Sequence, residues 1–303
     1  MSPSGILNVN KDPGPTSFDV VRFVRKRSGV PKVGHAGTLD PSARGVLLVC
    51  LGQAVRVTEY LMRLPKVYRA SIRLGIETDT YDAEGTPAST GDISDVTEAR
   101  LRPALAAFVG TIDQVPPPYS AVKVGGERAY RLARRGETAL LKPRQAHVYR
   151  LDVLSFEPPF AEIEVECGRG TYIRSLAHDL GQRLGCCAHL SALVRTRIGP
   201  FSIEDARTMA RLEAAFADGS WQEILLPIDL ALMDLPALTL GIEDEKDIRH
   251  GQAVRLDPET TVLPDVPEGA ECRAYGEDGS LVAIVAYDTA EGVWRPRRVF
   301  QAG

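Results

Sequence analysis

Two segments in which apolar and polar residues alternate strictly place the tightest constraint on the fold of this chain. One is residues 68–75 and the other is residues 160–167. In the second segment, apolar residues alternate with three glutamates. In the first, the opposite face is basic or polar and the apolar face consists of Tyr68, Ala70, Ile72 and Leu74. Because successive side chains of a β-strand point to opposite faces, this period predicts two half-buried strands.

Other segments predict further strands and helices. The apolar run at residues 45–52 is bounded by glycines and fits a strand that is buried on both faces. Residues 77–95 are acidic and rich in Gly, Thr and Ser, which is typical of a loop or hairpin. A shorter strand is predicted at residues 5–11, and helices are predicted from Thr16 or Ser17 to about Arg27, at residues 96–109 and at residues 171–184.

The start of the last of these helices follows a Gly-rich turn. Thr171 is the expected N-cap, and Gly185 is expected to end the helix. On this interpretation Tyr172 and Arg174 lie in the first helical turn, near the positive end of the helix dipole.

The segment 114–121 contains three consecutive prolines, which exclude a central strand or a helix interior. We expect this segment to cross the surface and to lead into a basic helix around Arg131. The composition changes again near Leu235, beyond which short strands and turn signals dominate. The chain is therefore expected to divide into a larger α+β domain, residues 1–235, and a small β-rich module suited to a compact barrel, residues 236–303.

Charge is distributed unevenly along the chain, although the net charge is only −4. Residues 1–75 carry +8, residues 119–150 carry +6 and residues 167–200 carry +4, so that the remainder carries −22. If the three segments meet in the fold, they form a basic surface suited to a phosphate-rich partner. The alternative is that segregation along the sequence does not survive folding as a patch.

Residues 34–41, with the sequence GHAGTLDP, place one carboxylate, Asp40, on a Gly-rich turn. Loops on rigid scaffolds often carry chemistry, and the turn suits a side chain held out at a cleft. Asp40 followed by Pro41 equally fits a helix N-cap with proline at the first helical position. The spacing alone favours the N-cap, and both interpretations stay open at this point.

Metal and disulfide sites are not expected. The five cysteines form no CxxC pair, and the five histidines show no paired spacing. Cys186 and His189 are three residues apart, but no second pair accompanies them. The chain also lacks the spacing of a Ser-His-Asp triad, a P-loop or a dinucleotide-binding site. With no secretory signal and no apolar run long enough to cross a bilayer, a cytoplasmic protein is expected.

One carboxylate in a basic context, together with tyrosines and an arginine, fits an enzyme that modifies a base of RNA. A carboxylate can act in covalent catalysis, an arginine can keep it ionised, and aromatic faces can hold a flipped base. Six blocks of sequence then occur in order along the chain, at residues 11–17, 35–41, 66–68, 114–130, 170–176 and 193–196.

These blocks resemble the KPxGxTS, HxGTLDP, KxY, QxPPxYSAxKxxGxxxY, GTYIRSL and LxRT motifs of the TruB-type tRNA pseudouridine-55 synthases. The resemblance extends over almost the whole chain, and six blocks in register are highly specific. The chain departs from the pattern at three positions. Asp12 is inserted in the first block, Leu48 stands where a proline is common, and Val194 stands where an arginine is common.

The resemblance implies that Asp40 is the catalytic carboxylate and attacks the target uridine. The glycosidic bond then breaks, and the base turns and rejoins the ribose through carbon 5. Whether attack falls on the ribose or on the base, or whether elimination comes first, is left open. Arg174 is expected to pair with Asp40, holding it ionised and aimed. Tyr68 is expected to stack on the flipped base and could take part in the later removal of the proton from carbon 5.

The same resemblance implies three further contacts with the substrate. Tyr172 lines the pocket, Leu193 forms a wall of it, and His35 contacts the tRNA stem-loop near the vacated stack. No metal or organic cofactor is implied, because the isomerisation involves no net redox change. The expected fold is a pseudouridine-synthase fold with a mixed, mostly antiparallel sheet, followed by a C-terminal PUA-like barrel.

The resulting hypothesis is a monomeric enzyme that converts uridine to pseudouridine at position 55 in the T arm of tRNA, without a membrane partner. A tRNA-folding role accompanies this hypothesis. Two alternatives stay open: a non-catalytic RNA-binding or RNA-folding protein that uses the same cleft, and a pseudouridine synthase that acts on another RNA.

Overall fold

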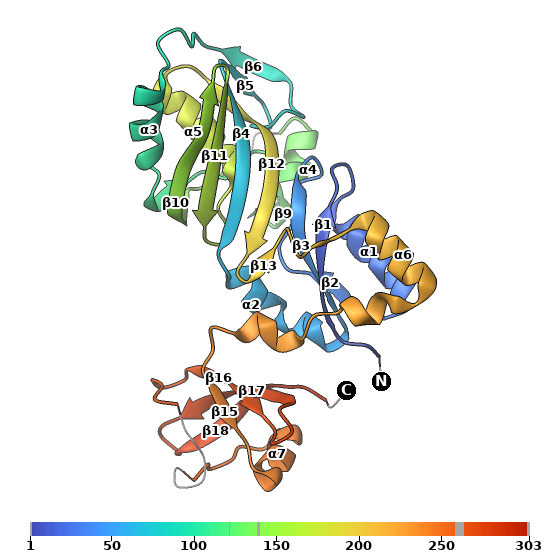
Figure 1. Ribbon diagram of the computed structural model, residues 1–303. Coiled ribbons are helices and arrows are strands. Elements are labelled where there is room, and N and C mark those ends of the chain that lie inside the picture. Colours follow the sequence, from blue (N-terminus) through green and yellow to red (C-terminus); the bar gives the residue numbers. More distant parts are fainter. Residues whose placement is uncertain (1, 121, 138–139, 258–263, 302–303) are drawn as a thin grey trace.

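The computed structural model describes residues 2–120, 122–137, 140–257 and 264–301. A ten-stranded sheet forms the centre of the larger part of the molecule (Figure 1). Two short strands lie off its main path: β2 (Val33–His35) pairs with β3 (Arg44–Leu51), and β13 (Phe201–Ser202) pairs with β12 (Ala188–Ile198). Its other strands, in spatial order, are β14 (Arg207–Thr208), β1 (Gly5–Lys11), β3 (Arg44–Leu51), β12 (Ala188–Ile198), β4 (Lys66–Leu74), β11 (Phe160–Cys167), β10 (Arg144–Glu157) and β7 (Gly110–Gln114).

The sheet is mixed and mostly antiparallel, as predicted. Among the strand pairs of this sheet in the described part of the chain, only β1–β14 and β3–β12 are parallel. The junction of β3 with β12 joins the two halves of the sheet. Because β12 pairs with β4 on its other side, it connects the N-terminal strands to the strands of residues 66–74 and 160–167 in one sheet.

The two alternating segments that dominate the sequence are confirmed as strands, and they are direct neighbours. In β4 and β11 the predicted inward residues are buried or partly buried, and the opposite face is more exposed. Arg69 lies opposite Glu164 in the register, and their side chains form an ion pair at 3.4 Å. The basic outer face of β4 therefore meets an acidic outer face, which lowers the charge that it presents.

Helices cover the sheet in two groups. On one half, α3 (Glu98–Ala106) and α5 (Ile173–Leu184) share a buried apolar cluster with β4, β11 and β12. On the other half, α1 (Ser17–Ser28) and α6 (Met209–Asp218) pack against β1 and β3. Thr16 is the N-cap of α1, within the range predicted, and Asp19 completes a capping box with it.

The start of α5 differs from the prediction. The N-cap is Tyr172, and Thr171 lies before the helix, where its hydroxyl donates a hydrogen bond to the carbonyl oxygen of Gly168 at 3.1 Å. Arg174 is in the first turn, as predicted, whereas Tyr172 is not. Thr171 was therefore wrongly predicted as the cap, because its hydroxyl finds a partner in the preceding Gly-rich turn. The helix ends at Gly185 in the left-handed conformation, as expected.

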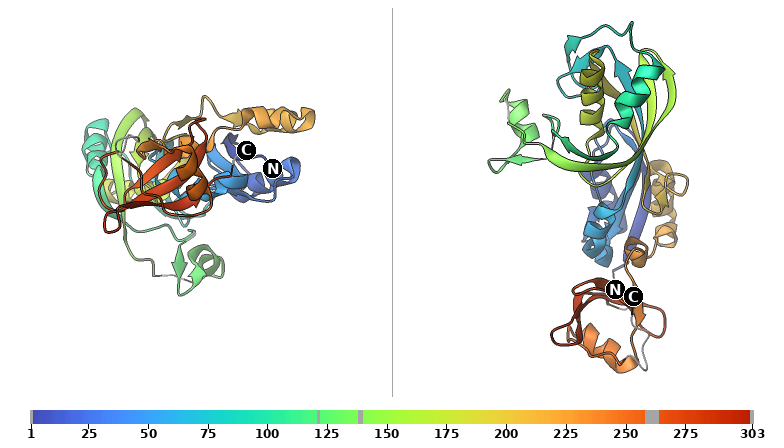
Figure 2. Two further views of the ribbon diagram at one scale, coloured as in Figure 1. Left: turned by 90° about the horizontal axis from the view of Figure 1, so that it is seen from below. Right: turned by 90° about the vertical axis from the view of Figure 1, so that its left-hand side faces the viewer.

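Two segments extend from the body of the sheet. The hairpin of β5 (Ile76–Thr78) and β6 (Pro87–Thr90) confirms the hairpin expected within residues 77–95. The second segment, with β8 (Lys123–Val124), β9 (Glu127–Arg128) and α4 (Ala129–Arg134), projects away from the body, as Figure 2 shows. The preceding segment of prolines has no helix or strand after Gln114, but Pro116 and Pro117 are buried, so the expectation that it crosses the surface is wrong for these residues.

A four-stranded sheet of β15 (Ala237–Thr239), β16 (Glu271–Tyr275), β17 (Leu281–Asp288) and β18 (Val293–Val299) follows, together with α7 (Ile242–Arg249). It has its own apolar cluster, which includes Leu238, Ile248 and Trp294. Within residues 253–256 the structure has a single bridge, between Val254 and Trp294. The short helices η2 (Ser220–Ile224) and η3 (Ile228–Leu232) connect this module to the rest of the chain.

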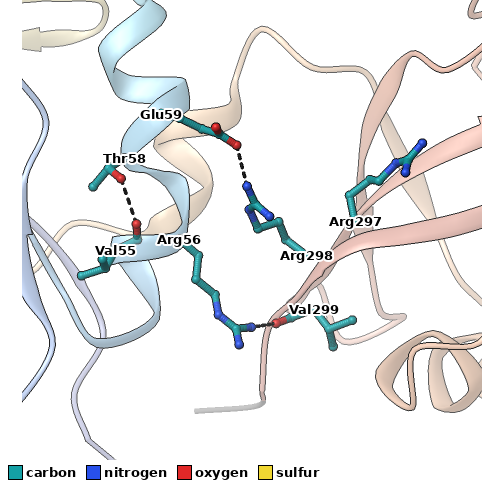
Figure 3. A pocket seen from close by; sticks show the side chains of 7 residues that line it. All are labelled: Val55, Arg56, Thr58, Glu59, Arg297, Arg298 and Val299. Atoms are coloured by element: carbon teal, nitrogen blue, oxygen red, sulfur yellow. Dashed lines mark hydrogen bonds and ion pairs between the residues drawn. The ribbon is translucent and has the colours of Figure 1, made fainter. Parts of the chain in front are cut away.

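The C-terminal module packs against η1 (Gly52–Val57) and α2 (Thr58–Arg63) (Figure 3). Arg56 donates a hydrogen bond to the carbonyl oxygen of Val299, and Arg298 forms an ion pair with Glu59 at 2.7 Å. These residues line a cavity of about 500 Å³, with Arg297 at its edge. No helix in the described part of the chain is both long and apolar enough to span a membrane.

Candidate active site

Asp40 lies in an irregular loop between β2 and β3, and no helix follows it. Pro41 and Ser42 form a bend, and β3 begins at Arg44. The backbone N–H of Ala43 donates a hydrogen bond to the carbonyl oxygen of Asp40 at 3.1 Å, which closes a tight turn. The N-cap interpretation of Asp40 is therefore wrong. The loop leads directly into β3, a buried central strand, so the carboxylate is presented from a rigid part of the fold.

On one side, the loop is held by a buried arginine from β12. The guanidinium of Arg195 donates hydrogen bonds to the carbonyl oxygens of Gly37 at 3.1 Å, Thr38 at 3.4 Å and Val46 at 2.7 Å. Its side chain is 1% exposed. A buried cation is costly unless its donors are satisfied, and here the loop carbonyls satisfy them. Arg195 thus fixes the backbone immediately before Asp40.

On the other side, the loop is held by Lys11, at the end of β1. The ammonium group of Lys11 donates hydrogen bonds to the carbonyl oxygens of Pro41 at 3.0 Å, Asp12 at 2.9 Å and Pro15 at 2.9 Å. Burial lowers the pKa of Lys11, and the neighbouring carboxylates of Asp12 and Asp40 oppose this shift. The backbone immediately after Asp40 is therefore fixed as well.

Ser17, the first residue of α1, holds a third point of the loop. Its hydroxyl accepts a hydrogen bond from the backbone N–H of Leu39 at 2.9 Å and donates one to the carbonyl oxygen of Leu39 at 3.1 Å. Ser17 and Leu39 are both buried. Three side chains that are distant in the sequence thus bind the backbone on both sides of Asp40 and leave its carboxylate free.

The carboxylate of Asp40 is bound by Arg174 in a forked geometry. The Nε of Arg174 lies 3.0 Å from Oδ2 of Asp40, and its Nη2 donates to Oδ1 at 3.2 Å. The side chain of Arg174 is 7% exposed and that of Asp40 is 36% exposed, so solvent or a substrate reaches the carboxylate but not the guanidinium. Such a pair fixes both the charge and the orientation of the carboxylate. The predicted contact between Asp40 and Arg174 is present.

Arg174 is itself held by three other acceptors. Its Nη1 lies 3.5 Å from Oδ2 of Asp82 and donates to the carbonyl oxygen of Thr80 at 3.3 Å. Its Nη2 donates to the carbonyl oxygen of Tyr119 at 3.1 Å. Asp82 is buried and also accepts hydrogen bonds from the Thr80 hydroxyl and the backbone N–H of Glu84. The guanidinium thus bridges two carboxylates and cannot turn away from Asp40 without losing bonds on its other edge.

Tyr68 and Leu193 lie on neighbouring strands beside this ion pair. In the register of β4 and β12, Leu193 is opposite Ala70, and Arg195 is opposite Tyr68. Both Tyr68 and Leu193 are partly buried and pack against the apolar clusters on the two halves of the sheet. Burial raises the pKa of the Tyr68 hydroxyl, and the charge of Arg195 opposes this shift. At neutral pH the Tyr68 hydroxyl is therefore a donor that has kept its proton.

Tyr172 is positioned through its backbone. Its N–H donates to the side-chain oxygen of Gln114 at 2.7 Å, and the side-chain nitrogen of Gln114 donates to the Tyr172 carbonyl at 3.0 Å. Burial raises the pKa of the Tyr172 hydroxyl, and Arg144 and Arg174 oppose the shift. Tyr172 therefore stands at the start of the helix that carries Arg174, within electrostatic range of Asp40.

His35 forms no hydrogen bond or ion pair with Asp40 or Arg174 in the described part of the chain. It ends β2 and is partly buried, and its Nδ1 is a buried atom without a hydrogen-bond partner in the described part of the chain. Burial lowers its pKa, and the nearby charge of Arg195 adds to this effect. His35 thus lies just before the loop that carries Asp40, within electrostatic range of Arg195.

Five supporting residues were not predicted from the sequence. Lys11, Gln114 and Arg195 lie within the motif blocks but received no role there, and Ser17 was considered only as a helix cap. Asp82 lies in the acidic loop of residues 77–95, where no pattern distinguished it. A lysine or arginine within a predicted buried strand is a usable signal, since it needs buried partners. No group of three or more His, Cys, Asp and Glu side chains suited to a metal ion occurs among the described residues.

Comparisons with known proteins agree on one family. The family description "TruB family pseudouridylate synthase (N terminal domain)" matches residues 25–173. A second description, "tRNA pseudouridylate synthase B C-terminal domain", matches residues 174–233. The two matches meet inside α5, next to Arg174, and end before β15.

Relatives extend the similarity over nearly the whole chain. A tRNA pseudouridine synthase B from Dehalococcoides mccartyi is 44% identical over 297 residues, covering 98% of this chain and 96% of the relative. One from Symbiobacterium thermophilum is 48% identical over 252 residues, covering 82% of each protein. One from Pseudomonas aeruginosa is 40% identical over 304 residues, covering 99% of this chain and 97% of the relative.

Solved structures support the same fold. A chain in a structure of an H/ACA RNP bound to a substrate RNA containing 2′-deoxyuridine has a TM-score of 0.75 and 27% identity, covering 98% of this chain and 85% of that one. A chain in the crystal structure of a Cbf5-Nop10-Gar1 complex also has a TM-score of 0.75, with 29% identity and the same coverage. The predicted fold class is confirmed.

Proposed function

The chain belongs to the TruB family of pseudouridylate synthases, and from this we propose that it isomerises uridine to pseudouridine at position 55 in the T loop of tRNA. The observation that carries the proposal is the forked ion pair between a partly exposed Asp40 and a buried Arg174. A reactive carboxylate needs to be ionised, aimed and accessible, and this arrangement meets all three requirements.

In the proposed reaction, the target uridine leaves the base stack and enters the cleft beside Asp40. The bond from N1 of the base to C1′ of the ribose breaks, and a bond from C5 to C1′ forms. One proton leaves C5 and one is gained at N1, so the isomerisation is redox-neutral. Asp40 supplies the carboxylate that carries the substrate through these steps, and Arg174 holds that carboxylate in one orientation.

The other site residues receive roles as binding groups. Tyr68 stacks on the flipped base, and its hydroxyl stands ready to assist proton transfer at C5. Tyr172 lines the same pocket from the start of α5, and Leu193 forms an apolar wall on β12. His35 contacts the RNA stem-loop beside the position that the base has left. These four assignments rest on the matching motifs and on their placement around the Asp40 loop.

The two parts of the molecule receive different roles. We assign catalysis to residues 1–235, and RNA binding through a PUA-like module to residues 236–303. Three arginines, Arg56, Arg297 and Arg298, line the cavity where these parts meet, which suits a partner with a phosphate backbone. The proposed protein acts as a monomer in the cytoplasm on the T arm of tRNA and uses no metal or organic cofactor.

The test is conversion of a T-arm transcript by purified wild type and by Asp40→Asn. Wild type is expected to form pseudouridine at the T-loop uridine, and the variant is expected to lose at least about a thousandfold in rate. RNA affinity is expected to stay unchanged, since asparagine preserves the size of the side chain. Asp218→Asn, at the exposed end of α6, is the matched control and should behave as wild type.

Two outcomes favour the alternatives. If wild type binds the transcript but forms no pseudouridine, the non-catalytic RNA-binding hypothesis is supported. If the transcript is unmodified while another cellular RNA gains pseudouridine, the substrate assignment is wrong. Mapping pseudouridine in cells that lack the protein decides between these outcomes, and an unmodified T loop is the result that the proposal requires.

A further inference from the structure

An aromatic stack adjoins the turn whose residues Thr80 and Asp82 bind Arg174. The rings of Tyr81 and His178 are nearly parallel, with centroids 3.9 Å apart and planes inclined by 20°. Tyr81 belongs to the turn between β5 and β6, and His178 belongs to α5. His178 follows Arg174 by four residues, so the two side chains leave α5 on the same face, one turn apart. The stack therefore joins the helix that carries Arg174 to the turn that receives it.

Tyr81 lies between the two residues of the turn that bind Arg174. The residues on either side of it, Thr80 and Asp82, are both acceptors for Nη1 of Arg174, at 3.3 and 3.5 Å. A displacement of Tyr81 moves both acceptors, because they are its immediate neighbours in the chain. The orientation of the guanidinium, and with it the fork on Asp40, thus depends on where Tyr81 is held.

The backbone of Tyr81 has a conformation that is unfavourable for a tyrosine. Its φ angle is +64°, in the left-handed region that a bulky side chain rarely adopts. Two backbone hydrogen bonds restrain it: its N–H donates to the carbonyl of Thr78 at 3.2 Å, and its carbonyl accepts from Leu190 at 3.0 Å. Such a conformation persists where surrounding contacts over-determine it. The ring stack adds to the hydrogen bonds that the hydroxyls of Thr78 and Thr80 donate to Asp82, and together these side-chain contacts oppose relaxation of the turn.

The imidazole is also held at both edges. Nε2 of His178 lies 3.5 Å from a carboxylate oxygen of Glu77, and Nδ1 lies 3.1 Å from a carboxylate oxygen of Asp179. The other oxygen of Glu77 accepts a hydrogen bond from Gln182 at 2.7 Å. His178 is therefore a fixed surface, anchored by α5 and by β5, against which the Tyr81 ring rests.

We propose that the Tyr81–His178 stack is a positioning device for the isomerisation, which holds the turn of Thr80 and Asp82 so that Arg174 keeps Asp40 in its reactive orientation. This inference rests on the proposed function. Neither ring touches Asp40, so both residues act through Arg174. The device acts on the orientation of the reacting carboxylate and not on RNA affinity, so its loss lowers kcat and leaves KM nearly unchanged.

The experiment compares alanine with ring-preserving substitutions, in steady-state kinetics on the T-arm transcript. Tyr81→Ala and His178→Ala are each expected to lower kcat about tenfold, with KM within about twofold. Tyr81→Phe and His178→Phe, which keep a ring at each position, are expected to retain kcat within about threefold. The double alanine variant should be no worse than about the worse single variant, since both remove the same contact.

The chain contains a matched control. His147 and Tyr149 on β10 form another His–Tyr ring pair, with centroids 4.7 Å apart and a tilted geometry. Tyr149 is exposed, and in the described part of the chain neither residue of this pair forms a hydrogen bond or ion pair with Arg174 or with residues 78–82. Tyr149→Ala should therefore keep wild-type kcat.

A second measurement does not depend on turnover. The Nε–H of Arg174 faces Asp40, so its NMR resonance in ¹⁵N-labelled protein reports the fork directly. The resonance is expected to shift or broaden in Tyr81→Ala and to keep its wild-type position in Tyr81→Phe. If wild type forms no pseudouridine, the proposed function has failed, and the resonance still tests the device.

Three results would overturn the inference. The first is a wild-type kcat in both alanine variants. The second is a loss of kcat that the phenylalanine variants share in full, because a ring is then not what matters. The third is an unchanged Arg174 resonance in Tyr81→Ala.

Discussion

Asp40 and Arg174 form one ion pair, but the molecule holds its two members in opposite ways. Asp40 is held through its backbone, because Lys11, Ser17 and Arg195 all bond to main-chain atoms of residues 37–41. Arg174 is held through its side chain, by Asp82 and by two carbonyl oxygens. The carboxylate of Asp40 thus keeps one partly exposed side, whereas the donors of the Arg174 guanidinium are all paired.

This difference separates reactivity from rigidity. A carboxylate that had to hold its own loop would spend its acceptors on structure and would have none for a substrate. Here buried cations from β1 and β12 supply the structure, and the carboxylate of Asp40 keeps one partly exposed side. Catalytic groups that are held in advance avoid reorganisation during the reaction, which is the general advantage of such preorganisation.

Substitution of Asp40 and substitution of Arg174 are expected to differ most in how far each lowers the free energy of unfolding. Arg174→Met leaves two carboxylates facing each other and removes the donor from the carbonyl oxygens of Thr80 and Tyr119, so we expect the free energy of unfolding to fall by about 3 to 5 kcal/mol. Asp40→Asn leaves the backbone contacts of the loop intact but replaces one acceptor of Arg174 with an amide nitrogen, and we expect a smaller loss, of about 1 kcal/mol. Both variants should be almost inactive. Urea unfolding measures the difference.

Equal destabilisation by the two substitutions would contradict the comparison. It would mean that the carboxylate of Asp40 carries structure after all, and that the backbone contacts of its loop are secondary. A smaller loss in Arg174→Met than in Asp40→Asn would contradict it more strongly.

The second prediction breaks the loop support instead of the ion pair. Arg195→Met removes the donor from three carbonyls, and we expect a loss of about 2 to 4 kcal/mol in the free energy of unfolding. Because displacement of a reacting group by about 1 Å can cost a hundredfold in rate, kcat should fall about a hundredfold.

Arg197→Met is the control for this prediction. Arg197 lies two residues further along β12, on the exposed face, where it forms an ion pair with Glu166 at 3.3 Å. Exposed pairs contribute little, so we expect a change below about 1 kcal/mol and a normal kcat. A normal kcat in Arg195→Met would show that the loop keeps its position without this cation.

The sheet was predictable from the sequence to a large extent, because strands follow local periodicity. Residues 68–74 and 160–167 alternate as half-buried strands must, and residues 45–51 are apolar throughout. Their pairing was not predictable, since it depends on contacts between segments that lie far apart in the chain. The opposition of Arg69 and Glu164 emerged only with the register.

The site was only partly predictable, for the same physical reason. The contact of Asp40 with Arg174 followed from resemblance to a family and not from spacing. Local cap chemistry was right at Thr16 and Gly185. It misled at Asp40 and Thr171, because tertiary and turn contacts took up the groups that a helix end would have used. Asp82 carried no local signal at all.

Charge along the sequence overstated charge on the surface. Lys11, Lys66, Arg174 and Arg195 belong to the segments counted as basic, yet all four are buried. Their donors serve carbonyl oxygens and carboxylates inside the protein. A basic segment is thus evidence for an RNA-binding surface only after its buried cations have been subtracted.

The smallest effect predicted concerns two adjacent hydroxyls at the start of α1. Thr16 caps the helix, accepting a hydrogen bond from the N–H of Asp19 at 3.1 Å, whereas Ser17 bonds twice to the backbone of Leu39 in the Asp40 loop. Loss of either hydroxyl is expected to cost about 1 kcal/mol in the free energy of unfolding. Thr16→Ala should keep wild-type kcat, because the loop is untouched, while Ser17→Ala should lower kcat about threefold. Equal stability with unequal kcat would separate support of the loop from support of the helix, and an equal kcat in the two variants would show that Lys11 and Arg195 suffice to hold Asp40.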